Sequence, residues 1–306
     1  MIGNWEITKV DHIGGGEEQQ DSVATFSTPD GQSHLLVVAD WMGGHKGGRI
    51  ASYAVVKSAQ LGWKKYRQCQ MEPPQFLQFI CELAHKNINL LGKKYHISPR
   101  STVVLLYIRG KKAWWAYIGD SRLYHFRRYK LLYRTKDHSI VQMLVDLGRV
   151  NEEDMATHPD QGRLLKGLGG DEVIQASMGQ TSVHPGDSFV LCSDGFWEQI
   201  SPSKMLDKLS QTHLSLGKQV KELVKEAFDA GGDKGDNIAV EVARLKEKTF
   251  LNIITYLIIS LIIIILGGGV WYYFKSYASS SAPMSVTTKI SNPTDTPLET
   301  EEIVHE

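Results

Sequence analysis

The chain has 306 residues, and its 34 lysines and arginines balance its 34 aspartates and glutamates, so the formal net charge is zero. Proteins dedicated to binding nucleic acid normally carry a basic excess, so this balance argues against nucleic acid as a partner. With 42% hydrophobic and 22% charged residues, the chain is also too apolar to be disordered throughout. Cys69, Cys81 and Cys192 lack the spacing of a disulfide scaffold or a zinc site, and we expect reduced thiols of a cytosolic compartment.

Residues 1–245 contain helices inserted among short strands. His34–Ala39 is a short apolar run and predicts a buried strand, and apolar residues at helical spacing predict helices over 47–67 and 74–95. Further strands are predicted in two hairpins and two late apolar runs: 102–108 with 114–118, 123–126 with 130–133, 189–192, and 238–243. This order is typical of an α+β layered domain and not of alternating βαβ units.

The segment Phe250–Phe274 contains no charged residue. A helix over it is about 37 Å long at roughly 1.5 Å per residue, enough to cross a bilayer with some tilt. Residues 271–273 are aromatic, as is common at a membrane interface. A buried core helix is the alternative, although such helices rarely exceed about 14 fully apolar residues. We therefore predict a transmembrane helix over 250–274, preceded by a basic linker at 246–249.

Charges on either side of this helix predict its orientation. Residues 275–306 contain five acids and two bases, which leaves −3 on this tail and +3 on residues 1–274. Because cytoplasmic flanks favour Lys and Arg, we expect residues 1–249 in the cytoplasm and the tail across the membrane. The N-terminus has no apolar segment typical of a cleaved signal, and the Ser-, Thr-, Pro- and acid-rich tail predicts disorder.

Aspartates recur where apolar runs begin or end, at Asp21, Asp40, Asp120, Asp194 and Asp236. A carboxylate at the end of a buried strand is costly unless a positive charge meets it. Carboxylate oxygens are hard ligands that suit Mg²⁺ or Mn²⁺ better than Zn²⁺. Each aspartate alone is equally compatible with a turn or a helix cap, but all five together favour a metal site.

Six segments carry a resemblance to a known family. They are ADWMGGHKGG (39–48), RSTVVLLYIRG (100–110), AYIGDSRLYHFR (116–127), KDHSIVQMLVDLG (136–148), LCSDGFWEQIS (191–201) and GDNIAVEV (235–242). In this order and spacing they resemble the motifs of the metal-dependent PP2C-type protein Ser/Thr phosphatases in their bacterial form, over about residues 5–245. The resemblance implies a four-layer α/β/β/α sandwich of two antiparallel sheets, with a site for two Mn²⁺ or Mg²⁺ ions between the sheets.

The resemblance also assigns metal-binding roles by motif position. Asp40 resembles the carboxylate that bridges both ions, and the backbone carbonyl of Trp41 joins it. Asp194 and Asp236 resemble the remaining acidic ligands. Asp21 resembles the acid that holds metal-bound water, and Asp120 the acid that can share a third ion with Asp194; Asn237 and Gly195 match neighbours that shape the site.

These roles imply direct hydrolysis, with Asp21, Asp40, Asp194 and Asp236 as the catalytic acids. A water activated by two metal ions attacks the phosphorus of phosphoserine or phosphothreonine in line, without a covalent intermediate. No cysteine nucleophile is needed, so we expect the cysteines to be structural.

Three positions depart from the family pattern. Gly16 stands where many members have an arginine that binds the substrate phosphate, Gln19-Gln20 replaces the usual Asn-Glu or Asn-Gln before the acid, and Trp41 replaces a glycine. Candidate cations for substrate binding are Lys46, Arg49 and Arg122, although Arg122 belongs to a motif and a structural role is open for it. We expect Trp41 to keep its carbonyl available to a metal.

Other candidate functional residues lie on loops. His45 has the pKa range of a general acid, although orienting its loop is the alternative role, and His138 and His158 are expected to be structural. Residues 139–185 resemble the flap subdomain of the family, where Arg163 and Lys166 are further candidates for substrate binding. Loops of this kind usually set selectivity.

Two functions remain open at this point. The first is an active phosphatase of phosphoserine and phosphothreonine proteins that opposes a bacterial Ser/Thr kinase, with its catalytic domain on the cytoplasmic side of the inner membrane and its tail in the periplasm. The second is a weak or inactive homologue that acts as a membrane-anchored, phosphoprotein-binding regulator. Gly16 and Trp41 favour the second, whereas the complete set of acids favours the first.

Overall fold

The computed structural model of the chain describes residues 4–42, 48–69, 71–128, 130–246 and 250–280. The chain divides into two compact units, Met1–Glu247 and Lys248–Glu306. The first unit contains two antiparallel sheets of five strands each. One has the spatial order β1 (Trp5–His12), β10 (Ile238–Leu245), β9 (Asp187–Cys192), β6 (Arg122–Arg127) and β7 (Lys130–Arg134). The other has the order β2 (Ser22–Ser27), β3 (Ser33–Ala39), β4 (Val103–Arg109), β5 (Lys112–Ile118) and β8 (Ser177–Ser182).

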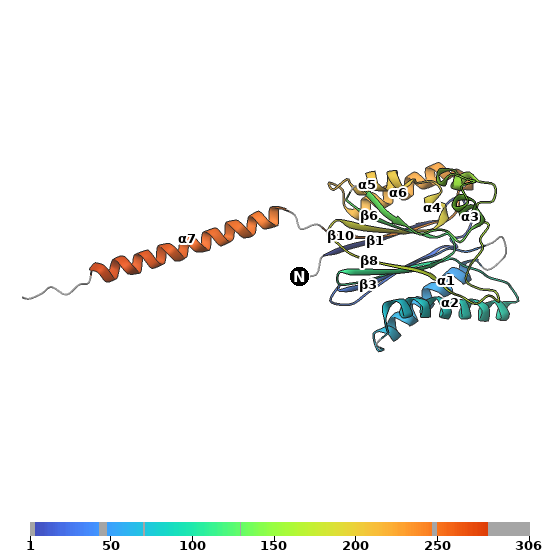
Figure 1. Cartoon of the computed structure of the whole chain (residues 1–306), viewed down its shortest axis with the longest axis horizontal. Helices are drawn as coiled ribbons and strands as arrows, with labels where there is room; N and C mark the ends of the chain where they lie inside the picture. Colours follow the sequence, from blue (N-terminus) through green and yellow to red (C-terminus); the bar gives the residue numbers. More distant parts are fainter. Residues whose placement is uncertain (1–3, 43–47, 70, 129, 247–249, 281–306) are drawn as a thin grey trace, which may run out of the picture. The chain divides into compact units, whose positions relative to one another are not determined.

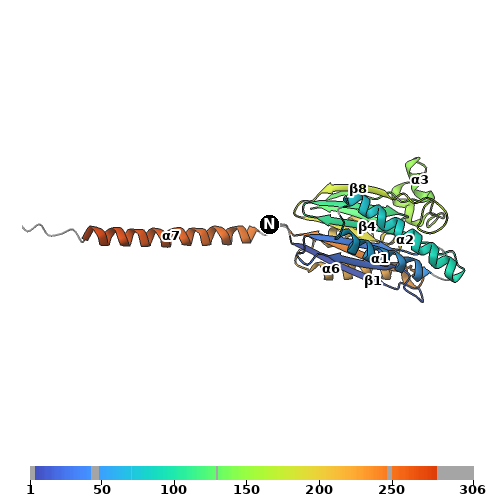
Figure 2. The same ribbon diagram turned by 90° about the horizontal axis from the view of Figure 1, so that it is seen from below.

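Helices cover the outer face of each sheet, which confirms the predicted α/β/β/α sandwich (Figures 1 and 2). The long helices α1 (Gly48–Tyr66) and α2 (Pro73–Tyr95) cover the β2–β8 sheet. The β1–β7 sheet is covered by α4 (Asp194–Trp197), α5 (Pro202–Leu209) and α6 (Leu216–Gly231). The remaining short helices of this unit are α3 (Ile140–Asp146), η1 (Glu152–Thr157) and η2 (Gly232–Lys234).

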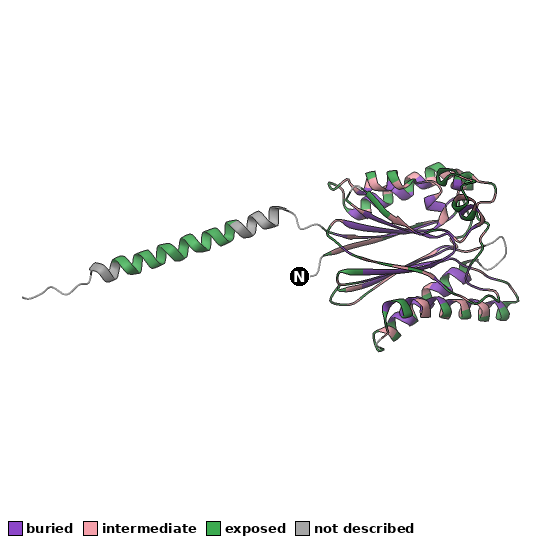
Figure 3. Cartoon of the chain, in the orientation of Figure 1, coloured by how far each residue is buried: buried purple, intermediate pink, exposed green. Residues whose placement is uncertain are grey.

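The central strands are apolar on both faces because both faces are buried. In β3, Leu35 and Val37 pack against the helices α1 and α2, whereas the alternate residues Leu36 and Val38 pack between the two sheets. Figure 3 shows the resulting buried layers, with the strands buried and the outer helix faces exposed. The long apolar runs that predicted β3, β4, β9 and β10 follow from this double burial.

Three strands have no counterpart among the predicted elements: β1, β2 and β8. Strands β1 and β8 are largely polar, and β2 is half polar. Strand β8 alternates half-buried and exposed residues without a large apolar face. Within the segment 139–185, for which a flap subdomain is predicted, Ser177–Ser182 forms β8 and pairs with β5 at the edge of the sheet. Residues 139–176 lie outside both sheets. An isolated bridge between Ser101 and Leu168 attaches this segment to the rest of the domain, and one between Ser139 and Leu164 joins two parts of the segment itself.

The second unit contains one long helix, α7 (Phe250–Ser280). It begins at the predicted residue and continues six residues beyond the predicted end, because neither Lys275 nor the following Ser, Tyr and Ala residues break a helix. Within it, Ile258–Ser276 is long and apolar enough to span a membrane, and none of this stretch is buried inside the protein. Residues 247–249 of the predicted linker (246–249) and residues 281–306 of the predicted tail (275–306) lie outside the described residues.

Candidate active site

The predicted acids gather at one end of the sandwich because of the strand directions. Neighbouring strands of an antiparallel sheet run in opposite directions, so one strand ends beside the start of the next. Asp21 precedes β2, Asp40 follows β3 and Asp120 follows β5, all at the same end of one sheet. Asp194 follows β9 and Asp236 precedes β10, at one end of the other sheet.

These two ends meet at a cavity of about 290 Å³. Four of the predicted acids line it, namely Asp40, Asp120, Asp194 and Asp236, together with Trp41, Thr102 and Asn237. Gly162 and Leu164 of the segment between α3 and β8 line it as well. Asp21 is also buried but is not part of this lining.

Hydrogen bonds hold the backbone around Asp40 in place. The N–H of Asp40 donates to the hydroxyl of Thr102 (2.9 Å), and the Asp40 carbonyl accepts from the hydroxyl of Ser101 (2.7 Å) and the N–H of Thr102 (2.8 Å). The hydroxyl of Thr102 also contacts that of Ser121 (2.6 Å), which precedes β6 in the opposite sheet. The neighbouring Trp41 has an ordinary backbone, since the non-glycine residues with positive φ in the described part are His96 and Arg128. Trp41 thus occupies a glycine position of the family pattern without strain of that kind.

Asp21 is tied to the opposite sheet by Ser193. The hydroxyl of Ser193 donates to Asp21 Oδ2 (2.7 Å) and accepts from the N–H of Ala239 (2.9 Å). The other oxygen, Asp21 Oδ1, is buried and has no hydrogen-bond partner. One buried carboxylate oxygen is therefore left for a ligand that the chain itself does not supply.

The loop that carries Asp236 rests on the glycines that precede Asp21 in sequence. A Cβ atom on Gly14 would lie 2.1 Å from the carbonyl oxygen of Asp236, and one on Gly15 would lie 2.2 Å from that of Asp233. At Gly16 a Cβ would lie 3.3 Å from the side-chain nitrogen of Asn237. The run of three glycines thus permits close contact between two loops, and this contact accounts for Gly14 and Gly15 independently of any role in phosphate binding.

Burial and mutual repulsion raise the pKa values of the clustered acids. Burial is the largest cause for Asp40, whose pKa is raised well above its usual range, and the charges of Asp21 and Asp194 add to it. Burial and the charge of Asp194 raise the pKa of Asp120 in the same way. Burial raises the pKa of Asp21 to about 8, against the opposing effect of hydrogen bonds with Asp40 and Ser193. Burial and Asp236 raise the pKa of Asp194 to about 6.

This donor set fits hard divalent cations. All the side-chain donors are carboxylate oxygens, two of them, Asp21 Oδ1 and Asp120 Oδ2, are buried without a partner, and added positive charge would offset the repulsion that raises their pKa values. Within the described residues, no three His, Cys, Asp or Glu side chains converge as ready ligands of a single ion. Asp40 lies within side-chain hydrogen-bonding reach of both Asp21 and Asp194, so these carboxyl groups are close to one another.

The predicted substrate-binding cations lie outside the cavity lining. Arg49 is exposed and lies 3.8 Å from Glu18, and Arg163 is exposed and pairs with Asp160 at 2.7 Å. Lys166 is exposed as well. Arg163 nevertheless lies between two lining residues, Gly162 and Leu164, so its segment borders the cavity. His45 and Lys46 fall outside the described residues.

Arg122 is buried, unlike the other candidate cations. Its guanidinium donates to both carboxylate oxygens of Asp137, at 2.9 and 2.6 Å, and lies 3.3 Å from the centre of the Trp197 ring. Trp197 in turn donates its indole N–H to the backbone carbonyl of Asp120 (3.0 Å). This placement favours the structural role left open for Arg122, as a support behind Asp120.

Sequence reasoning did not identify Glu198 and Gln161. Burial, followed by the charge of Asp194, raises the pKa of Glu198 to about 7. Its carboxylate accepts a hydrogen bond from the Gln161 side chain (2.9 Å), next to the lining residue Gly162. The bond attaches the flap segment to the end of α4, which begins at Asp194. Glu198 follows Asp194 by one helical turn, and this spacing is the sequence feature that could have identified Glu198 as a neighbour of the site.

His138 has the structural role expected for it. Its Nδ1 accepts from the N–H of Gly119 (3.1 Å), its Nε2 contacts the hydroxyl of Ser177 (2.9 Å), and its ring stacks on Tyr117. Burial is the main cause that lowers the pKa of His138 to about 4, with the charge of Lys166 adding to it. A neutral imidazole therefore braces the turn that carries Asp120.

The family model for protein phosphatase 2C matches residues 10–229 of the chain. The chain belongs to the protein phosphatase 2C family. Protein phosphatase PhpP of Streptococcus pneumoniae is 29% identical over 231 residues, which cover 75% of this chain and 92% of PhpP. The serine/threonine phosphatase of S. agalactiae has a similar structure, with a TM-score of 0.68 and 27% identity over 79% of this chain and all of that one. The catalytic domain of the phosphatase PstP, solved with two manganese ions, shares the fold with a TM-score of 0.67 at 24% identity, over 79% of this chain and 99% of that one.

Membership of this family makes the chain a PP2C-type Ser/Thr phosphatase of the bacterial kind. The matched residues, 10–229, include Asp21, Asp40, Asp120 and Asp194 and end just before Asp236. The matched residues therefore lie within the unit that carries the acidic cavity.

Proposed function

We propose that the chain is a metal-dependent protein phosphatase that hydrolyses phosphoserine and phosphothreonine by direct attack of water. The observation that carries the proposal is the convergence of Asp40, Asp120, Asp194 and Asp236 on one cavity with raised carboxyl pKa values. The manganese pair in the related PstP domain supports two ions of Mn²⁺ or Mg²⁺ here. A third, shared by Asp120 and Asp194, is part of the proposal.

Each residue contributes to the site in a stated way. Asp40, Asp194 and Asp236, with the carbonyl of Trp41, would hold the ions, and Asp21 would fix a water through its unpaired Oδ1. Bound divalent cations supply the activation of water near neutral pH and offset charge on the phosphoryl oxygens. Thr102 and Ser101 hold the Asp40 backbone, and Asn237 joins the loops by accepting from the N–H of Gln20 (2.6 Å) and donating to the carbonyl of Ile13 (2.6 Å).

We further propose that α7 anchors the phosphatase in the inner membrane of a bacterium, where it opposes a Ser/Thr kinase from the cytoplasmic side. The apolar stretch Ile258–Ser276 and the basic residues that precede the helix support this location. For His45 we propose one of two roles, either as a general acid or as a residue that orients its loop.

Metal removal tests the proposed chemistry. Purified full-length protein is treated with EDTA and assayed with p-nitrophenyl phosphate, and activity is expected to vanish and to return with Mn²⁺ or Mg²⁺ but not with buffer alone. Activity that survives chelation would contradict the mechanism, and complete inactivity under all metal conditions would favour the phosphoprotein-binding alternative.

Truncation tests the proposed membrane anchor. A chain that ends at Glu247 is expected in the soluble fraction of a lysate. Its retention in the membrane fraction would contradict the assignment of α7.

A further inference from the structure

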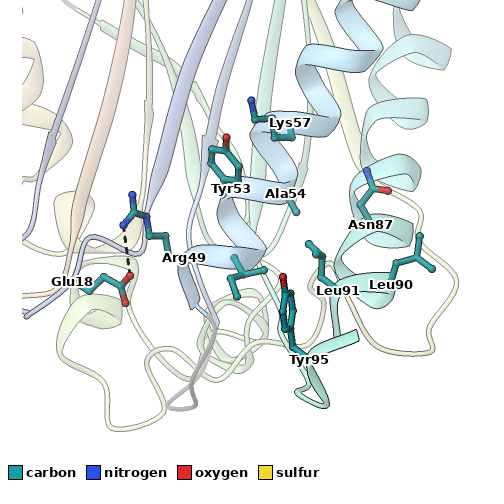
Figure 4. A pocket seen from close by; sticks show the side chains of 10 residues that line it. Glu18, Arg49, Tyr53, Ala54, Lys57, Asn87, Leu90, Leu91 and Tyr95 are labelled. Atoms are coloured by element: carbon teal, nitrogen blue, oxygen red, sulfur yellow. Dashed lines mark ion pairs between the residues drawn. The ribbon is translucent and has the colours of Figure 1, made fainter. Parts of the chain in front are cut away.

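A groove of about 730 Å³ lies between the first half of α1 and the last half of α2 (Figure 4). Apolar side chains dominate its lining, and three of them are large and about half exposed: Tyr53 (52%), Leu90 (54%) and Tyr95 (50%). Ile50 and Leu91 lie between these residues and the core. Exposed aromatic and leucine side chains around a concave surface are typical of a binding site.

The helices around this groove are strongly basic, although the whole chain is neutral. Residues 48–95 contain eight lysines and arginines but only two acids, Glu72 and Glu82. Among the described residues, six exposed lysines of these helices make no ion pair with an acid: Lys57, Lys64, Lys65, Lys86, Lys93 and Lys94. Two of them lie over groove aromatics, Lys57 over Tyr53 at 5.2 Å and Lys94 over Tyr95 at 5.1 Å. The surface therefore complements an acidic partner that also carries an apolar side chain.

The groove lies at the same end of the domain as the acidic cavity. Glu18 lines the groove and Gln20 lines the cavity, and two residues of chain separate their Cα atoms by at most about 7 Å. The hydroxyl of Ser52, on α1, donates to the carbonyl of Gln20 and joins the helix to this short segment. Arg49 stands at the groove rim, where Figure 4 shows it directed toward Glu18.

We propose that this groove binds the substrate segment next to the phosphorylated residue, through an apolar anchor flanked by acidic residues. The inference rests on the proposed phosphatase function and adds the class of substrate that it selects. From Arg49 to Lys57 the helix α1 rises about 12 Å, which an extended peptide covers in about four residues. The step of at most about 7 Å between Glu18 and Gln20 adds about two residues between the cavity and the groove. The anchor should therefore lie roughly three to six residues from the phosphorylated residue, with the acids facing the lysines.

Binding of two labelled peptides tests the proposal on the full chain in detergent micelles. Both carry a non-hydrolysable phosphonate in place of phosphothreonine. The first has a leucine flanked by glutamates about five residues from the phosphonate, and it is made in two versions, with the leucine on the N-terminal or on the C-terminal side. The second has serine and glutamine instead. The leucine peptide is expected to bind about tenfold more tightly in at least one version, as for a buried anchor residue. Equal affinities for all versions would overturn the proposal.

Matched variants locate the effect. Leu90→Asp should abolish the preference for the leucine peptide, whereas Leu61→Asp, on an equally exposed leucine of α1 outside the groove lining, should leave it intact. Lys57→Glu should weaken binding of the acidic peptide more than Lys64→Glu does. If both leucine variants behave alike, the groove is not the binding site. If Leu90→Asp acts only in micelles that contain phosphatidylglycerol, and equally on both peptides, the groove contacts lipid and the proposal fails.

Hydrolysis of p-nitrophenyl phosphate separates this inference from the function on which it rests. This small substrate cannot reach the groove, so Leu90→Asp should leave its kcat/KM unchanged. Intact hydrolysis with no peptide preference would overturn the docking inference alone. A peptide preference that depends on Leu90 in a protein without hydrolysis would support the docking site and overturn the proposed catalytic function.

Discussion

Ser193 donates its hydroxyl hydrogen to Asp21 across the interface between the two sheets, at 2.7 Å. Ser193 follows β9 in one sheet, and Asp21 precedes β2 in the other. The N–H of Ala239 fixes the same hydroxyl from the neighbouring strand β10. The direction of Asp21 thus depends on a residue 172 positions away in sequence.

Removal of this hydroxyl should weaken metal binding. Ser193→Ala leaves Asp21 without its donor, and loss of a residue that orients a metal-binding group typically costs about 10- to 100-fold in metal affinity or activity. We expect the Mn²⁺ concentration for half-maximal phosphatase activity to rise at least about tenfold, with activity recovered at high Mn²⁺. Ser203→Ala, at an exposed position of α5, is the control. An unchanged Mn²⁺ requirement would show that Ser193 does not position Asp21.

Position 14 should tolerate no side chain, because an added Cβ atom would meet backbone atoms of Gly235 and Asp236. Its φ of +63° disfavours alanine, and the added Cβ would also meet the carbonyl oxygen of Asp236 at 2.1 Å. Gly31 has nearly the same φ, +64°, with no atom within 4 Å of the added Cβ. Gly31→Ala is therefore expected to cost about 1 kcal/mol of stability from backbone strain alone, with full activity. Gly14→Ala should lose more stability and most activity, as measured by urea unfolding and phosphatase assay. Equal effects of the two substitutions would contradict the close contact between the loops.

Arg122 should support the fold and contribute little to substrate affinity. Arg122→Met removes the guanidinium that binds both oxygens of the buried Asp137 carboxylate, while Arg134 remains at 3.6 Å. The expected loss of stability is therefore below the roughly 3–5 kcal/mol typical of a buried charge left without a partner. The double variant Arg122→Met/Asp137→Leu removes both charges and should recover part of that loss. Urea unfolding measures stability, and KM for p-nitrophenyl phosphate measures substrate binding in the folded fraction. A raised KM at unchanged stability would instead assign Arg122 to the substrate.

Glu241 makes stability depend on pH between about 4.5 and 8. It is fully buried between the sheets, where it accepts hydrogen bonds from the Thr25 hydroxyl and the Val37 N–H (3.1 Å), and burial is the main cause that raises its pKa from 4.5 to about 8. Because the folded-state pKa is higher, the folded protein keeps this proton after the unfolded chain has lost it. The stabilisation is therefore fully present below about pH 4.5 and is lost as the pH rises to about 8.

Glu241→Gln should remove this pH dependence while keeping the shape of the side chain. As the pH is raised from 5 to 9, the glutamine variant should become more stable relative to the unchanged protein. Urea unfolding measures the difference in unfolding free energy at each pH. Glu6→Gln, at a partly exposed acid of β1, controls for general charge effects. A difference that stays constant with pH would mean that the folded-state pKa of Glu241 is not raised.

Local sequence patterns predicted those parts of the fold that bury apolar residues. The strands β3, β4, β5, β9 and β10 and the helices α1 and α2 have apolar runs or helical spacing that is independent of their partners. Strands β1 and β8 pair with strands distant in sequence, which leaves no local signal. Strand β2 pairs with the adjacent β3, but only half of its six residues are apolar.

The acids of the site were predicted for a similar reason. Each of Asp40, Asp120 and Asp194 follows an apolar strand. The sequence therefore indicates a carboxylate at the end of a buried strand, where its charge is costly without a positive partner. The residues that position them were not predictable, because the contact of Ser193 with Asp21 and that of Gly14 with Asp236 join segments about 170 to 220 residues apart.

Hydrolysis of a phosphothreonine peptide by the unchanged protein and by Asp40→Asn, both at saturating Mn²⁺, tests the central claim most directly. Asp40 lies beside Asp21 of its own sheet and Asp194 of the other, so the amide removes a carboxylate that neighbours acids from both sheets. We expect kcat/KM to fall by at least about a thousandfold, about 4 kcal/mol of transition-state stabilisation, with the fold retained. An Asp40→Asn protein that hydrolyses the peptide at the unchanged rate would contradict the assignment of this acidic cavity as the active site.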